Sequence, residues 1–317
     1  IRDQPRSRGL GDVYKRQAFS LPIMGSRLGT LIGLILFSFF LQFFTWRLIF
    51  VAFLPLGLIA TLASIPMLLQ KDSQNPLRSV PIDLVGGGLF IIVAPILILS
   101  GNHLHSGEES FTSSDGLKYH LPMHGLFLLM LGIFILVERK LSNPLVDVNH
   151  FRQKYFSLSI ASNATFHFSM LATMVLIPIL VDRGFELKPI WVTVALVPNQ
   201  VLGIIIPLIA GWVYDRYQPK MLRPAAMACI ALGFLAFGLL SNISPFWAIP
   251  VMMIPISVGS AVFNPINNAT IMSTLPLNHR GFASGMLETT RELGHALGAT
   301  ASATCLLYTS PSPRDRG

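Results

Sequence analysis

The chain of 317 residues is 52% hydrophobic and only 12% charged, and its formal net charge is +8 at pH 7. Soluble domains carry about 25% charged residues, so this composition excludes an ordinary soluble protein and favours one that lies in a lipid bilayer. Two cysteines are too few for a disulfide framework or a thiolate metal site.

Both ends of the chain resemble a single sequencing-library adapter translated from its two opposite strands. One strand encodes residues 7–17 without a mismatch, and its complement encodes residues 305–314. We therefore expect residues 1–17 and 305–317 to be adapter-derived and disordered, with residues 18–304 an internal fragment of a longer protein. The ends carry +4 of the net charge, and the remaining +4 is no argument for nucleic-acid binding.

Nine apolar runs follow one another between these ends. A bilayer core requires about 20 mostly apolar residues per helix, and each run is close to that length. Hydrophobic residues occupy all sides of each run, which favours spanning helices over amphipathic surface helices. The sequence therefore predicts an all-α polytopic membrane protein with about nine transmembrane helices, at approximately 18–42, 46–69, 81–101, 121–138, 157–181, 190–214, 221–241, 246–272 and 281–304.

Lys and Arg residues are distributed unequally between alternate connections. One set of connections holds ten of them and the other set holds four. Because positive loops stay inside, loops 70–80, 139–156, 215–223 and 276–281 are predicted to be cytoplasmic, in a bacterial-type inner membrane. The long external loop, 101–120, contains histidines and acidic residues without regular ligand spacing, so neither a metal nor a cofactor is predicted.

The first run contains a glycine packing motif at Gly25, Gly29 and Gly33. Small residues at every fourth position give one smooth helix face against which a second backbone can lie closely. Such a pattern is common in membrane helices, and plain packing explains it equally well.

The sixth run ends in a charged motif made of Gly211, Asp215, Arg216 and Lys220. A carboxylate at a helix end, facing a neighbouring helix N-terminus and basic groups, can latch two helices in one conformation. A charged turn that caps two spans is the alternative interpretation.

Polar amides and a histidine interrupt the fifth and eighth runs. Asn163 and His167 lie four residues apart in the fifth run, and Asn264, Asn267 and Asn268 lie in the eighth. Hydrogen bonding between helices is the simplest interpretation of any single asparagine there.

The ninth run carries four ionisable residues, Glu288, Arg291, Glu292 and His295. Offsets of three, four and seven place them on one helical face. A charge inside a bilayer costs about 2.5–3.5 kcal/mol, so such groups are functional candidates. Carboxylates beside an arginine and an imidazole could take up and release protons, whereas a self-neutralising cluster that fixes helix packing is the alternative.

The order of these motifs along the chain resembles the major facilitator superfamily, most closely its fourteen-span drug:proton antiporter branch. Further motifs carry the same resemblance: Trp46-Arg47 with Pro55, Asp83 with Gly86, Glu138-Arg139, Asn143-Pro144 and Gly281 to Gly285. The resemblance implies the last two spans of an N-terminal bundle at 18–69, two extra linker spans at 70–155 and five spans of a C-terminal bundle at 156–304. It also implies that Asn163, His167, Asn264, Asn267 and Asn268 line a central cavity.

The function implied by this resemblance is proton-coupled efflux of small hydrophobic or cationic compounds by alternating access, without enzymatic activity or a cofactor. The expected partners are the lipid bilayer, the cargo and the proton, while the oligomeric state stays open. No GxxxxGK[ST] motif is present, which disfavours an ATP-driven pump. The alternatives are a polytopic enzyme acting on lipid and a membrane sensor or scaffold that transports nothing.

Overall fold

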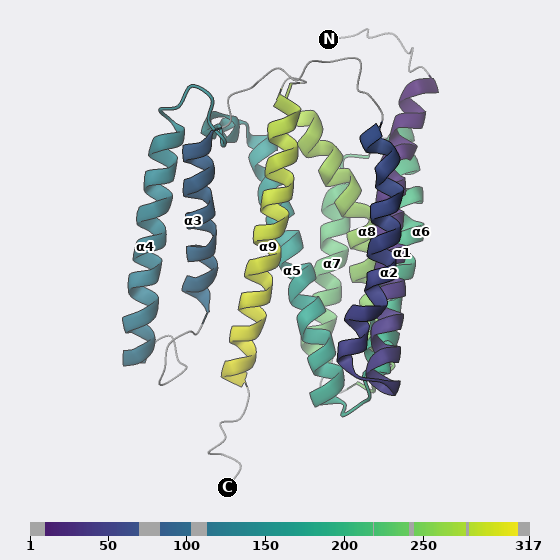
Figure 1. Ribbon diagram of the computed structural model, residues 1–317. Coiled ribbons are helices and arrows are strands. Elements are labelled where there is room, and N and C mark those ends of the chain that lie inside the picture. The colour runs from purple at the N-terminus through teal and green to yellow at the C-terminus, as the bar shows by residue number, and fades with distance from the viewer. Residues whose placement is uncertain are drawn as a thin grey trace. The chain divides into compact units, whose positions relative to one another are not determined.

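A computed structural model describes residues 10–69, 83–102, 113–217, 219–240, 244–276 and 279–309. Within these residues all regular structure is helical (Figure 1). The α-helices are α1 (Leu10–Phe43), α2 (Trp46–Leu69), α3 (Leu84–Gly101), α4 (Ser114–Glu138), α5 (Lys154–Ile179), α6 (Ile190–Tyr217), α7 (Leu222–Leu240), α8 (Ala248–Thr274) and α9 (Arg280–Thr309). A 3₁₀ turn, η1 (Val148–Arg152), precedes α5, and a π turn, η2 (Leu180–Gly184), follows it.

The predicted all-α membrane fold is confirmed. Among the described residues eight helices are long and apolar enough to cross a membrane. Helix α9 is long enough but does not reach that hydropathy, because Glu288, Arg291 and Glu292 lie within its length.

Three helix ends differ from the predicted runs by five residues or more. Helix α4 begins at Ser114, seven residues before the predicted run, because the backbone N–H of Gly116 donates to the Ser113 hydroxyl, which caps the polar first turn. Helix α1 begins at Leu10 and α9 ends at Thr309, so both include residues that we assigned to the adapter and expected to be disordered. The remaining positions that we assigned to the adapter, 1–9 and 310–317, lie outside the described residues.

The helices form two compact units, and the chain passes between these units inside α5 and α8. One unit comprises Ile1–Ser73 and Ile177–Ile266, and the other comprises Gln74–Leu176 and Asn267–Gly317. Pro178 lies inside α5 and Pro265 inside α8.

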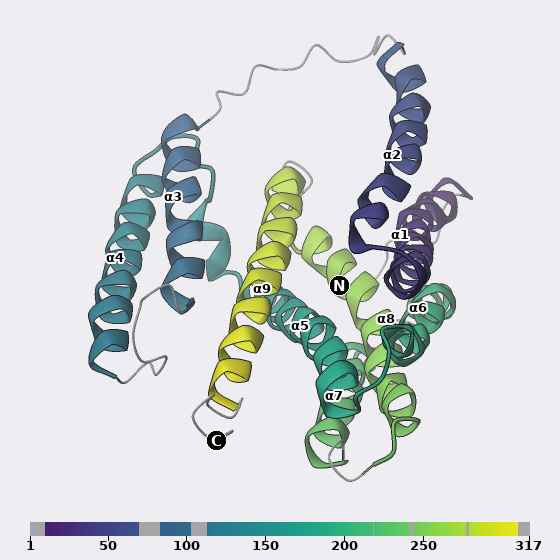
Figure 2. The ribbon, with the colours of Figure 1, turned by 60° about the horizontal axis from the view of Figure 1, so that its bottom comes forward.

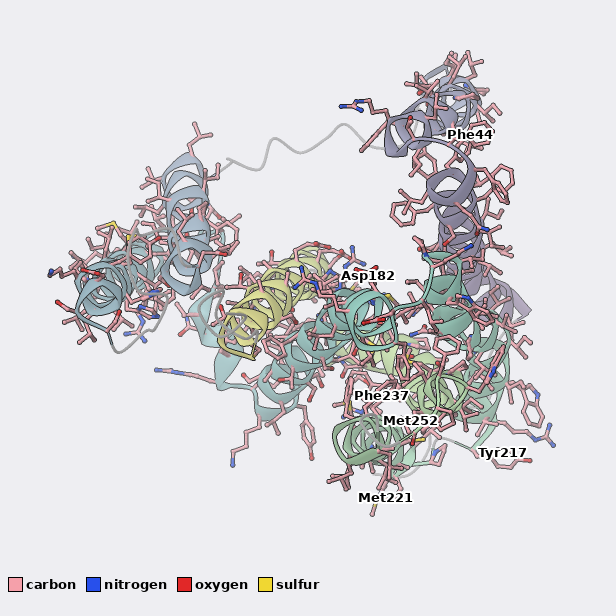
Figure 3. All side chains as sticks on the ribbon, turned by 90° about the horizontal axis from the view of Figure 1, so that it is seen from below. Phe44, Asp182, Tyr217, Met221, Phe237 and Met252 are labelled. Atoms are coloured by element: carbon pink, nitrogen blue, oxygen red, sulfur yellow. The ribbon has the colours of Figure 1, made fainter. Side chains whose placement is uncertain are left out.

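In the first unit α1 packs against both α2 and α6. The Thr193 hydroxyl of α6 donates to the Leu34 carbonyl of α1 and bonds the Ser38 hydroxyl, which is fully buried. Helices α7 and α8 meet along what we call the α7–α8 seam (Figure 3). A Cβ at Gly259 of α8 would lie 2.5 Å from the carbonyl oxygen of Ala226 in α7, so these backbones touch.

In the second unit α3 packs against α4 and α9, and α3 and α4 run side by side (Figure 2). An apolar cluster joins the ends of α5, α8 and α9. Its buried members are Phe156, Ile160, Ile271, Leu275, Ala283 and Leu287. This cluster fixes the register between α5 and α9, which carry the polar residues described next.

Candidate functional site

The four predicted ionisable residues of α9 form one continuous line of contacts. The Arg291 guanidinium pairs with the Glu288 carboxylate, and its Nε lies 3.1 Å from Oε1 of Glu292. The other Glu292 oxygen, Oε2, lies 3.6 Å from Nδ1 of His295. The shared helical face predicted from the sequence spacing therefore brings all four side chains together, with one arginine between two carboxylates.

This line of contacts continues onto α5 through His167. Nδ1 of His167 lies 3.0 Å from Nε2 of His295, and the two rings meet edge to face with their centroids 4.8 Å apart. His167 is only 6% exposed, whereas the side chains of Glu288 and Glu292 are 50% and 65% exposed. The line therefore runs from half-exposed carboxylates to a buried imidazole.

The contact between the two helices, which we call the α5–α9 seam, is closed by glycines. A Cβ at Gly294 would lie 2.5 Å from the carbonyl oxygen of Ala164, and a Cβ at Gly298 would collide with the carbonyl oxygen of Phe168. Glycines four residues apart let two membrane helices approach at backbone distance. The backbone contact fixes the separation at which His167 and His295 face each other.

Asn163 bridges the same seam. Its side-chain amide nitrogen donates to the Leu287 carbonyl and to the Thr290 hydroxyl, each at 3.0 Å. The amide hydrogens are thus committed to α9, while the buried carbonyl oxygen Oδ1 has no hydrogen-bond partner among the described residues. Asn163 therefore links α5 to α9 by hydrogen bonds between helices.

The three asparagines of α8 differ from one another in their bonding. Asn267 is 1% exposed and donates to the Ser159 carbonyl of α5 at 3.1 Å, which is again an interhelical bond. Asn264 and Asn268 each keep a buried side-chain oxygen without a hydrogen-bond partner among the described residues. An unpaired buried acceptor is costly, so these two oxygens are the better candidates for binding a polar group from outside the described residues.

The described residues make few contacts with the glycine motif and with the charged motif. At Gly25, Gly29 and Gly33 no described atom lies within 4 Å of an added Cβ. A Cβ at Gly211 would also meet open space. Arg216 stacks its guanidinium 5.9 Å from the Trp212 ring, Lys220 is exposed, and the Asp215 side chain lies outside the described residues.

Sequence reasoning missed Arg27, which lies inside the first membrane span. Its guanidinium donates to Oδ1 of Asn199 in α6 at 3.2 Å, beside Gly203, where a Cβ would lie 3.2 Å from the Arg27 Nε. A charged residue inside an apolar run was signal enough to find it.

Two more polar groups outside the predicted set lie near helix ends. His150 Nε2 lies 3.2 Å from Nδ1 of His279, which joins η1 to the start of α9. Asp83 caps α3, and its carboxylate accepts from the N–H groups of Gly86 and Leu145. These bonds hold the pKa of Asp83 below its usual range, and the bond from Gly86 contributes most.

Among the described residues no group of three His, Cys, Asp or Glu could hold a metal ion.

Comparison with known proteins matches the family model of the Major Facilitator Superfamily to residues 11–299. The chain is similar to the riboflavin transporter RibZ of Clostridioides difficile, with 24% identity over 86% of this chain and 56% of the relative. It is also similar to the multidrug efflux pump LfrA of Mycolicibacterium smegmatis, with 22% identity over 88% of this chain and 53% of the relative. The multidrug export protein EmrB of Haemophilus influenzae shares 26% identity over 83% of this chain and 50% of the relative. The chain thus spans about half the length of these relatives.

Proposed function

The chain belongs to the Major Facilitator Superfamily, and from this premise we propose that it is the middle part of a proton-coupled exporter of small hydrophobic or cationic compounds. The observation that carries the proposal is the line of ionisable groups from Glu288 through Arg291, Glu292 and His295 to His167. Groups of this kind are expensive inside a bilayer and mark proton or ion pathways. Relatives named as multidrug pumps support the direction and the cargo class.

We further propose that the complete protein belongs to the fourteen-span branch and that this chain supplies spans five to thirteen. In that arrangement α1 and α2 end the N-terminal bundle, α3 and α4 are the inserted linker spans, and α5 to α9 begin the C-terminal bundle. Loops 70–80, 139–156, 215–223 and 276–281 then face the cytoplasm, in agreement with their excess of Lys and Arg. The motif at Gly211, Asp215, Arg216 and Lys220 would latch two helices on that side.

The proposed mechanism is alternating access, in which two bundles rock around a central cavity. A proton that binds the α9 line neutralises one of its carboxylates and changes the charge beside Arg291. This change alters the free-energy difference between the two conformations, which is the requirement for coupling. The oxygens of Asn264 and Asn268 offer hydrogen-bond acceptors to a cargo that carries N–H or O–H groups.

Reconstitution of the full-length protein in lipid vesicles tests the proposal. We expect an imposed pH gradient to drive accumulation of a cationic dye, and we expect Glu288→Gln and Glu292→Gln each to abolish this accumulation while dye still equilibrates without a gradient. Asp182→Asn is the matched control, because Asp182 is an exposed carboxylate of η2 outside the line of contacts (Figure 3). Wild-type vesicles that move no dye under any pH gradient would refute proton-coupled export.

A second candidate cargo is riboflavin, favoured by the similarity to RibZ over most of this chain. Riboflavin fluorescence allows the same vesicles to report its movement directly. Movement of riboflavin without movement of cationic dyes would replace the proposed cargo class and leave the α9 line as the coupling element.

A further inference from the structure

The imidazole pair in the α5–α9 seam restricts how many protons it can bind. His167 Nδ1 and His295 Nε2 lie 3.0 Å apart, so one nitrogen carries the hydrogen and the other accepts it. Two N–H groups pointing at each other across this distance would repel, both sterically and through the charges of two imidazolium rings. In this geometry the pair therefore binds at most one proton beyond its two neutral rings.

Among the described residues, the ion pairs that adjoin His295 lie on α9. Nδ1 of His295 faces Glu292, and Arg291 is paired with Glu288 and Glu292. Helices α3 and α8, which also contact α9 or α5, carry no ionisable residue over Leu84–Gly101 and Ala248–Thr274. The carboxylate that adjoins the pair in these contacts is that of Glu292.

The seam gives the pair a fixed geometry. Gly294 lies against the Ala164 carbonyl and against Cβ of His167, and Gly298 lies against the Phe168 backbone. Because backbones rather than flexible side chains are in contact, the separation of α5 and α9 is fixed at this point. A second proton is thus excluded as long as the two ring nitrogens stay within hydrogen-bond distance.

We infer that His167 and His295 form a single-proton site that carries the coupling proton, an inference that rests on the proposed antiport function. In the transfer, the carboxylic acid of Glu292 gives its proton to Nδ1 of His295. Nε2–H of His295 passes its proton to Nδ1 of His167, which then holds it as an imidazolium. On His295 one N–H bond forms as another breaks, so His295 ends neutral, the carboxylate of Glu292 is restored and the pair as a whole holds one added proton.

The first test compares pH-driven transport by the full-length protein with that of His167→Gln, His295→Gln and the double variant. We expect each single variant to lose pH-driven transport and to keep cargo equilibration without a gradient. We expect the double variant to be no worse than either single variant, because the two rings act as one unit. Ser302→Ala is the matched control, since it removes a buried hydroxyl of α9 that cannot titrate, and its pH profile should equal that of the wild type.

The pH profile also separates proton binding from cargo binding. If His167 only contacted cargo, His167→Gln would raise the cargo concentration for half-maximal transport and leave the pH profile unchanged, which would overturn the inference. Undiminished pH-driven transport in either single variant would overturn it as well.

The second test does not depend on transport. Nitrogen-15 NMR of the histidine-labelled full-length protein should show a coupling across the N–H···N bond and uptake of one proton by the two rings together. The coupling should vanish in either single variant and persist in Ser302→Ala. Uptake of two protons in the closed seam would overturn the inference. A wild type with the single-proton signal but no pH-driven transport would refute the proposed function instead.

Discussion

The α5–α9 and α7–α8 seams both depend on glycines that contact the neighbouring helix, and they differ in the side chains between the helices. Both place a glycine of one helix against the backbone of the other, at Gly294 and Gly298 in the first and at Gly233 and Gly259 in the second. The α5–α9 seam encloses Asn163, His167 and His295, whereas Ile230, Met252 and Ile256 make the α7–α8 seam apolar. Close packing of two helices therefore does not require an amide or an imidazole between them.

The largest effect expected is loss of packing in either seam. Gly298→Val and Gly259→Val each place side-chain atoms into a neighbouring backbone, and each should lower the free energy of unfolding by about 3 kcal/mol. Thermal unfolding in detergent measures both variants. Gly238→Ala, at a position where an added Cβ meets nothing within 4 Å, is the control and should not destabilise. A tolerated Gly298→Val would show that the α5–α9 seam is open in solution and would end the comparison.

A smaller effect comes from the asparagines that bond α5 to its neighbouring helices. Asn163→Ala removes two interhelical hydrogen bonds and leaves the Leu287 carbonyl without that donor, which should cost about 1 kcal/mol. Asn267→Ala, which removes one interhelical bond, should cost less. Thermal unfolding again gives the measurement. Equal losses in the two variants would mean that the amides contribute by packing rather than by their hydrogen bonds.

A last effect, similar in size to that of Asn163→Ala, depends on pH. Since the pKa of Asp83 is lowered, its capping contribution is fully present above its pKa in the unfolded chain and is lost as pH falls through its lower pKa in the folded chain. Asp83→Ala should therefore be destabilised at neutral pH by about 1 kcal/mol, with the difference from wild type vanishing in acid. Ser113→Ala removes a hydroxyl cap from α4 and should show no such acid dependence.

This acid limb lies well below the range in which unperturbed histidines titrate. A capping loss that persisted unchanged into strong acid would contradict the lowered pKa.

The sequence predicted the helices well because a membrane span requires a local run of apolar residues. The run 46–69 coincides with α2, and the run 190–214 falls within α6. The start of α4 was missed because its first turns are polar and depend on the Ser113 cap rather than on hydropathy.

The contacts of the site were only partly predictable. The spacing of Glu288, Arg291, Glu292 and His295 defines their common face, since neighbours on one helix follow from its period. The pairing of His167 with His295 joins positions 128 residues apart, and it depends on how two helices rotate and slide against each other. The same holds for His150 and His279, to which the sequence alone assigned no role.

The prolines in α5 and α8 have a mechanical consequence. Pro178 and Pro265 lie within two residues of the points where the chain passes from one compact unit to the other. A proline supplies no backbone N–H, so each crossing lacks one rung of its hydrogen-bond ladder. A helix that lacks one backbone hydrogen bond bends most easily at that position. Elastic strain would then collect at Pro178 in α5 and at Pro255 and Pro265 in α8.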